Sequence, residues 1–301
     1  KKPVRFNMSL SRTQQFYYNP YVSSKPDKSK QFSITGITAG LAKRVQWPDD
    51  FFTVSHSLGY QLYNFQDYNL GLFNFGNGKS NSIAYTLGIS RNATGGGRIY
   101  PRTGSNFELT AKFTPPFSLF NNIDYKQLNE DMETAVEEQD SEEVERIDQE
   151  RFKWLEFYKV NFKGDWYTTL VDKLVLRTNA EFGFLGSYNE DVGKVPFERF
   201  YVGYENQSLT PYSTDLLSGG QVQDGGIVYN KYSLELRYPL TLKPSASIYG
   251  QVFLEAGNAF NNFQDFNPFE LKRSAGVGLR IFMPAFGLLG IDFGYGFDQD
   301  Y

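Results

Sequence analysis

Apolar and polar residues alternate with a period of two through most of the chain. Eleven such runs can be recognised, and the clearest lie at 4–11, 54–62, 107–113, 232–237 and 289–297. Successive side chains of a strand point to opposite faces, so each run predicts a strand with one apolar and one polar face. No run of about 18 or more apolar residues occurs, which argues against a transmembrane helix. The pattern therefore predicts an all-β fold.

The connections between these runs alternate in length. Short ones lie near 47–51, 92–105, 166–171, 240–245 and 284–287, and long ones near 17–30, 66–80, 115–154, 188–226 and 261–272. Short turns at one end and long loops at the other are typical of meandering barrels in bacterial outer membranes. The predicted architecture is an antiparallel transmembrane β-barrel.

The polar faces carry charged residues near the middle of the strands, whereas the apolar faces carry almost none. A soluble sandwich or lipocalin could show the same alternation. Its uniformity over eleven runs, together with the asymmetry of the loops, favours a membrane barrel with its polar face inward. Aromatic residues near the strand ends would then suit interfacial girdles: Tyr60, Tyr63, Phe113, Tyr158, Tyr238 and Tyr295.

The average composition is misleading about the class of protein. A net charge of −4 and a mean hydropathy of −0.46 suggest a soluble acidic protein. Residues 130–150, however, hold 11 acidic residues and one basic residue, so the remaining chain has a net charge of +6. The surrounding segment 126–153 contains no Gly or Pro and predicts either a solvated loop or a hairpin of short polar helices.

Catalytic chemistry has little support in the residue inventory. The chain has no Cys and a single His, so a disulfide framework, a catalytic triad or a zinc site of the usual kind is not expected. Positive charge is spread over strand faces rather than gathered in a patch, which argues against nucleic-acid binding. We expect a protein that is not an enzyme and that has no cofactor and no metal.

Charged residues of the polar faces are the best candidates for a site. Glu235 and Glu255 lie on consecutive predicted strands and point to the same side, as do Arg237, Arg280 and Asp292. Two interpretations are open. The residues could form an ion network inside the barrel, or the two acids could accept an Arg from a loop folded into the lumen, since Arg binds carboxylates through two hydrogen bonds.

Several segments resemble the barrel of the BamA family, the central subunits of the outer-membrane β-barrel assembly machinery. The turn after Tyr100, with Pro101, Arg102 and Gly104, resembles a periplasmic turn of that family. A second segment resembles the entry to that family's long sixth extracellular loop; it contains Pro196, Phe197, Phe200, Tyr201 and Gly203. Segments 233–239, 253–258, 274–280 and 284–295 resemble the strands that follow, in the same order and spacing.

This resemblance implies a sixteen-stranded barrel in a Gram-negative outer membrane. Residues 1–301 would supply its fifth to fifteenth strands, with the first four and the last one lacking, and 115–154 and 188–226 would be extracellular loops. The implied function is the folding and insertion of other barrels without ATP. The implied partners are nascent outer-membrane proteins, accessory lipoproteins and the bilayer with its lipopolysaccharide. Alternatives are a two-partner-type secretion barrel of the same superfamily, a passive porin and a surface enzyme.

In that family the sixth loop carries a Val/Leu-Arg-Gly-Phe/Tyr motif, whose Arg reaches acids on the next two strands. By position these acids would be Glu235 and Glu255. The motif is absent here, and the resemblance therefore predicts that loop 188–226 is incomplete between Gly203 and Tyr204.

Overall fold

The predicted fold class is confirmed by a single antiparallel sheet. The computed structural model describes residues 4–18, 21, 25–67, 77–203, 209–212, 225–243 and 245–298. Eleven strands pair in chain order, and each predicted run falls on one of them. The strands are β1 (Val4–Tyr17), β2 (Asp27–Arg44), β3 (Phe52–Gln66), β4 (Gly78–Gly95), β5 (Thr103–Phe113), β6 (Tyr158–Val171), β7 (Leu174–Gly186), β8 (Val228–Lys243), β9 (Ala246–Phe260), β10 (Lys272–Met283) and β11 (Gly287–Gly296).

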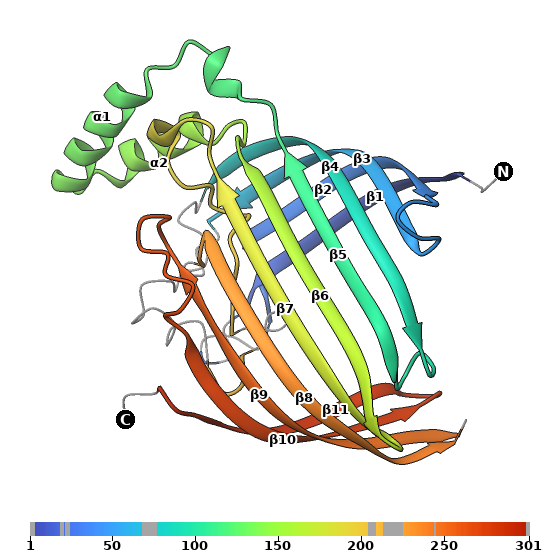
Figure 1. Cartoon of the computed structure of the whole chain (residues 1–301). Helices are drawn as coiled ribbons and strands as arrows, with labels where there is room; N and C mark the ends of the chain where they lie inside the picture. The colour runs from blue at the N-terminus through green and yellow to red at the C-terminus, as the bar shows by residue number, and fades with distance from the viewer. Residues whose placement is uncertain are drawn as a thin grey trace.

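The sheet curls into an open barrel (Figure 1). Within the described residues β1 and β11 each pair with one strand, so these two form the edges. The long connections lie at one end of the barrel, together with two helices, and the short turns lie at the other end (Figure 1). Some short turns are tighter than the alternation predicted: β6 runs to Val171, so only two residues separate it from β7.

The two faces of the sheet have the polarity of a membrane barrel. On β8, Leu234 and Leu236 on the outer face are 48% and 39% exposed, whereas Glu235 and Arg237 between them are 7% and 8% exposed. A soluble β-protein would bury the leucines and expose the charges. The inverted arrangement is expected when lipid covers the outer face and the polar face lines the lumen.

The interior at the loop end is filled by side chains. Val202 and Leu209 of the β7–β8 connection pack there with Tyr229 of β8 and with Tyr63 and Phe65 of β3. The prediction that Tyr63 belongs to an outer girdle is wrong. It lies one residue out of phase with the outward-facing Tyr60 and Leu62, and it is buried in the lumen.

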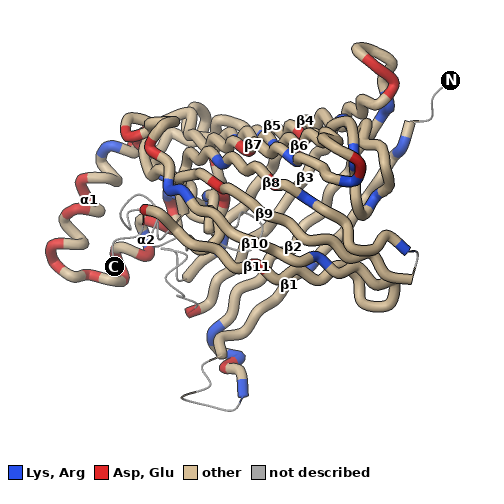
Figure 2. Tube along the Cα trace, turned by 60° about the horizontal axis from the view of Figure 1, so that its bottom comes forward, with Lys and Arg blue, Asp and Glu red and all other residues tan. Residues whose placement is uncertain are grey.

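The acidic segment forms a helical hairpin on the rim of the barrel. Helix α1 spans Tyr125–Glu137 and α2 spans Ser141–Arg151, and the 3₁₀ turns η1 (Phe117–Leu119) and η2 (Glu190–Val192) lie in the same region of loops. Asp124 and Asp140 cap the two helices by accepting bonds from backbone N–H groups of the first turn. Acidic residues run along both helices, which project beyond the sheet (Figure 2). Neither helix is long and apolar enough to cross a membrane.

Candidate functional site

The inner face of β6–β8 holds Glu235 between two arginines. Arg177 lies directly opposite Glu235 across the β7–β8 pair and donates to one of its oxygens. Arg237, two residues along on the same face, donates to the other oxygen through Nε at 2.7 Å and Nη2 at 2.5 Å. Arg177 also donates to Asp165, with its Nε at 2.8 Å. The wall of the barrel itself therefore satisfies both oxygens of Glu235.

A second ion pair lies beside this group on β10 and β11. Arg280 donates to the two oxygens of Asp292 at 2.7 and 2.9 Å. The amide of Gln251 can link the two groups, because it is placed to donate to Glu235 at 3.3 Å and to accept from Arg280 at 3.1 Å. Of the predicted network residues, Arg280 and Asp292 thus line one polar cavity of about 190 Å³ together with Glu235, and Arg237 joins them through its contact with Glu235.

Glu255 has a different partner from Glu235, although both acids line that cavity. Its Oε2 accepts a hydrogen bond of 2.9 Å from the backbone N–H of Thr210, in the connection between β7 and β8. Lys231 lies 3.4 Å from its other oxygen. Two residues further on, Tyr212 donates to the carbonyl of Arg273 at 2.8 Å. Glu255 therefore binds a loop inside the lumen, whereas Glu235 binds two arginines of the strands themselves.

The segment that starts the long loop also lies inside the barrel. Phe197 stacks on Tyr63 and Phe65 of β3, with ring centroids 4.9 and 4.8 Å apart. Phe200 pairs with Gly226 as an antiparallel bridge, and Pro196 is buried. The segment thus links β8 with the far side of the lumen at β3.

The other two residues predicted for the start of the loop lie at the end of the described stretch 77–203. Tyr201 and Gly203 are half-buried there, and Gly203 has a φ of +91°. The predicted break between Gly203 and Tyr204 lies at the edge of the described residues. Docking of an Arg on the two acids therefore stays a prediction.

Glu198 in the same segment was missed by the sequence analysis. Its Oε1 lies 2.5 Å from Lys112 on β5, and Lys159 on β6 donates to its backbone carbonyl at 2.6 Å. Lys112 and Lys159 are direct cross-strand neighbours. Like charges in that position are destabilising, so the pair needs an anion from elsewhere. The signal in the sequence was the presence of Lys112 and Lys159 on the polar faces of consecutive predicted strands; their direct opposition depends on the register, which the pattern does not give.

The predicted periplasmic turn, between β4 and β5, contacts the ion network at Arg237. Tyr100 donates to the carbonyls of Arg237 at 2.8 Å and Lys173 at 3.0 Å. Burial raises the pKa of Tyr100 to about 12, so the hydroxyl remains a donor at neutral pH. The Arg237 guanidinium lies between two aromatic rings, with its Cζ 5.7 Å from the Tyr167 centroid and 5.6 Å from that of Tyr249.

The remaining predicted residues of the turn fix its shape. Arg102 donates to the carbonyl of Asp172 in the next short turn, and Thr169 donates to the carbonyl of Arg102 at 2.9 Å. Pro101 precedes this contact. Gly104 has a φ of +88°, and a Cβ there would lie 1.9 Å from the carbonyl oxygen of Ala93. Only glycine fits that position, because side chains are disfavoured at such a φ.

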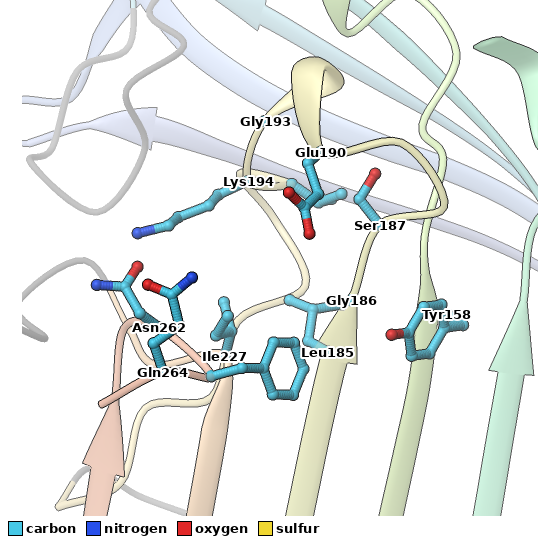
Figure 3. Close-up of a pocket in the computed structure, with 12 residues that line it drawn as sticks. Tyr158, Leu185, Gly186, Ser187, Glu190, Gly193, Lys194, Ile227, Asn262 and Gln264 are labelled. Carbon is cyan, nitrogen blue, oxygen red and sulfur yellow. The ribbon is translucent and has the colours of Figure 1, made fainter. Parts of the chain in front are cut away.

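A separate cavity of about 400 Å³ lies among the loops. Figure 3 shows Glu190 and Lys194 on one side of it and Asn262 and Gln264 on the other. Burial and the nearby positive charge of Arg199 lower the pKa of Lys194. None of the residues that line this cavity lines the polar cavity around Glu235 and Glu255.

An inverted antiparallel barrel wall with a loop drawn into its lumen is the architecture of a membrane β-barrel. The model of the Omp85 superfamily domain matches residues 1–301, and the chain belongs to that superfamily. No curated protein sequence matches the chain.

Two solved structures give the fold a closer context. BamA from Haemophilus ducreyi lacking POTRA domains 1–3 superposes with a TM-score of 0.67 at 16% identity, covering 99% of this chain and 56% of that one. CdiB from Escherichia coli gives a TM-score of 0.52 at 12% identity, covering 98% and 47%. The chain thus spans about half the length of each protein. At these identities the likeness concerns the fold.

Proposed function

We propose that this chain is the greater part of the barrel of an outer-membrane insertase, which folds and inserts other β-barrel proteins. The support is the likeness to BamA over 99% of the chain, with the higher TM-score of the two superfamily structures compared. The contact of Glu255 with Thr210 of the loop also supports the proposal, because the resemblance names Glu255 as one of two acids that receive the sixth loop. The proposed location is the bacterial outer membrane.

The proposed mechanism needs no covalent chemistry and no ATP. An incoming strand in an apolar medium must satisfy its backbone N–H and C=O groups, and pairing with an open barrel edge satisfies them. In the complete barrel, the lumen network and the docked loop would keep the wall rigid while strands pair elsewhere. Nascent outer-membrane proteins are the proposed substrates, and accessory lipoproteins are the proposed partners, with the acidic hairpin of α1 and α2 as one exposed surface.

A two-partner-type secretion barrel is the second candidate, because the fold also matches CdiB. Depletion of the complete protein in its host separates the two. An insertase predicts a fall in the amounts of many unrelated outer-membrane barrels. A secretion barrel predicts that one exported passenger is lost while the other barrels keep their levels, and this result would refute the proposal. A passive porin predicts neither effect but a conductance in planar bilayers.

A further inference from the structure

A cavity of about 720 Å³ lies on the outer face of the last strands. Six of its ten lining residues belong to the outer face: Tyr232, Leu234, Leu254, Ala256, Arg273 and Phe297. The other four, Asn179, Ser233, Glu255 and Ser274, form the single row of inward-facing residues between these outer rows. Ala256 pairs with Tyr232 on one side and with Arg273 on the other, and the N–H of Phe297 donates to the Arg273 carbonyl. These residues therefore form one row across β8–β11.

The row belongs to the face that points away from the lumen. Leu234 and Leu254, in the next row, are 48% and 53% exposed, and Phe297 is 54% exposed. Ala256 is the smallest side chain of its row and stands between Tyr232 and Arg273. The result is a furrow with a shallow floor, an aromatic ring near each end of the row and leucines toward the middle of the strands.

The furrow begins directly below a loop. Asn230 and Asn258 form the row above it and donate to the carbonyls of Pro268 and Glu270, each at 3.0 Å. The β9–β10 connection thus folds over the loop end of the furrow. This level, where the strands leave the apolar band, is where aromatic and basic side chains meet lipid headgroups.

Arg273 adds positive charge at that level. Its Nε and Nη2 donate to Asp298 at 3.1 and 2.7 Å, which leaves further N–H donors on the guanidinium. The side chain is 65% exposed, and the Lys272 Nζ lies 3.4 Å from the Asp298 carbonyl oxygen. Arg273 thus binds the Asp298 carboxylate and Lys272 lies at the carbonyl of the same residue, so these three residues carry a net charge of +1 at the mouth of the furrow.

From this geometry we infer that the furrow is a binding site for an acylated lipid with a phosphate headgroup, taken from the outer leaflet. One acyl chain lies over Ala256 toward Leu254, and the phosphate accepts hydrogen bonds from Arg273. The inference rests on the outer-membrane location in the proposed function, but not on insertase activity. A guanidinium next to a long apolar furrow matches both halves of such a lipid, whereas a protein segment would need partners for its backbone groups.

The test measures lipid retained by the full-length protein after extraction from nanodiscs of phosphatidylethanolamine containing lipid A, by native mass spectrometry. Arg273→Ala removes the phosphate ligand, and Ala256→Leu fills the floor without changing charge. Each is expected to lower lipid A retention by about tenfold, the effect of losing one charge-assisted contact or a comparable apolar one. Arg12→Ala and Ala39→Leu are matched controls, because both residues lie on the outer faces of β1 and β2, away from this furrow.

Dephosphorylated lipid A distinguishes the two halves of the site. Loss of the Arg273→Ala effect with this lipid, while the Ala256→Leu effect remains, supports the assigned roles. Equal retention by both variants and both controls would overturn the site and leave an ordinary lipid-facing surface. The insertase proposal is tested separately by the depletion experiment, which does not use these variants.

Discussion

Two parts of the lumen wall hold the same loop with opposite charges. The cationic wall, Lys112 of β5 and Lys159 of β6, binds the acid Glu198 at the start of the loop. The acidic wall, Glu235 of β8 and Glu255 of β9, receives the loop at Thr210 through Glu255. The loop is thus fixed at two points that lie on different sides of the barrel.

The difference between the walls shows which charges are free to bind a loop. Two lysines directly opposite each other repel and cannot satisfy one another, so they require an acid from outside the sheet. Glu235 has Arg177 opposite and Arg237 on its own strand, and its oxygens are occupied by the wall. Charge on a strand face therefore indicates a docking point only where the cross-strand neighbours leave it uncompensated.

Charge reversal of the loop acid should have the largest effect. Glu198→Lys places a third cation against Lys112 and Lys159, and breaking a buried ion pair in this way costs about 3–5 kcal/mol. The refolded full-length protein should unfold at a markedly lower urea concentration, as followed by Trp fluorescence. Glu137→Lys is the control, because Glu137 is an exposed acid on α1 and the variant makes the same change of charge there. Equal losses in the two variants would mean that Glu198 does not anchor the loop.

Removing both acids of the other wall should impair function in the complete protein. Glu235→Ala leaves Arg237 without its carboxylate, a loss of about 3 kcal/mol for a buried charge, and Glu255→Ala releases Thr210. We expect the double variant to lower the amounts of other outer-membrane barrels in cells. Unchanged amounts would contradict the role of the two acids. Glu181→Ala is the comparison, since its partner Lys163 is half exposed and can be solvated.

The strand pattern predicted the sheet because lipid and lumen impose opposite polarity on alternate residues. The eleven runs correspond to β1–β11, and the alternation on β8, from Ser233 to Arg237, appears directly as alternating exposure. Tyr63 was assigned to the wrong face, because an aromatic residue near a strand end suits both a lipid girdle and a filled lumen. Only its phase relative to Leu62 distinguishes the two.

The sequence predicted which face of the sheet carries the site residues, but it did not predict which residues they contact. Glu235 and Glu255 share a face by their position in the alternation, yet their different partners depend on register: Arg177 opposes Glu235, and Ser233 opposes Glu255. Register across a long loop is not written in a local pattern. For the same reason the contact of Glu198 with two lysines of β5 and β6, about 40 residues or more away, could not be assigned from spacing alone.

A milder change separates the charge of Glu255 from its role as an acceptor. Glu255→Gln keeps an oxygen for the Thr210 N–H and loses only the charge attraction to the buried Lys231 ammonium at 3.4 Å. Hydrogen exchange at the Thr210 amide should be unchanged in Glu255→Gln and much faster in Glu255→Ala. If both variants exchange at the same rate as the unaltered protein, Glu255 does not hold the loop.

The smallest expected effect comes from the turn beneath the acidic wall. Tyr100→Phe removes the hydroxyl that donates to the Arg237 and Lys173 carbonyls but keeps the ring that packs edge-on against Tyr249. Loss of a buried hydrogen bond of this kind costs about 1 kcal/mol, seen as a small shift of the urea midpoint. Tyr249→Phe is the control, since the Tyr249 hydroxyl makes no hydrogen bond within the part of the chain that the structure describes. A shift of the urea midpoint in Tyr100→Phe but not in Tyr249→Phe would show that the hydrogen bonds of Tyr100 stabilise the strand that carries Glu235.

The cationic wall, Lys112 and Lys159, has no contact with this turn. Combining Tyr100→Phe with Glu198→Gln should therefore lower the free energy of unfolding by the sum of the two single losses.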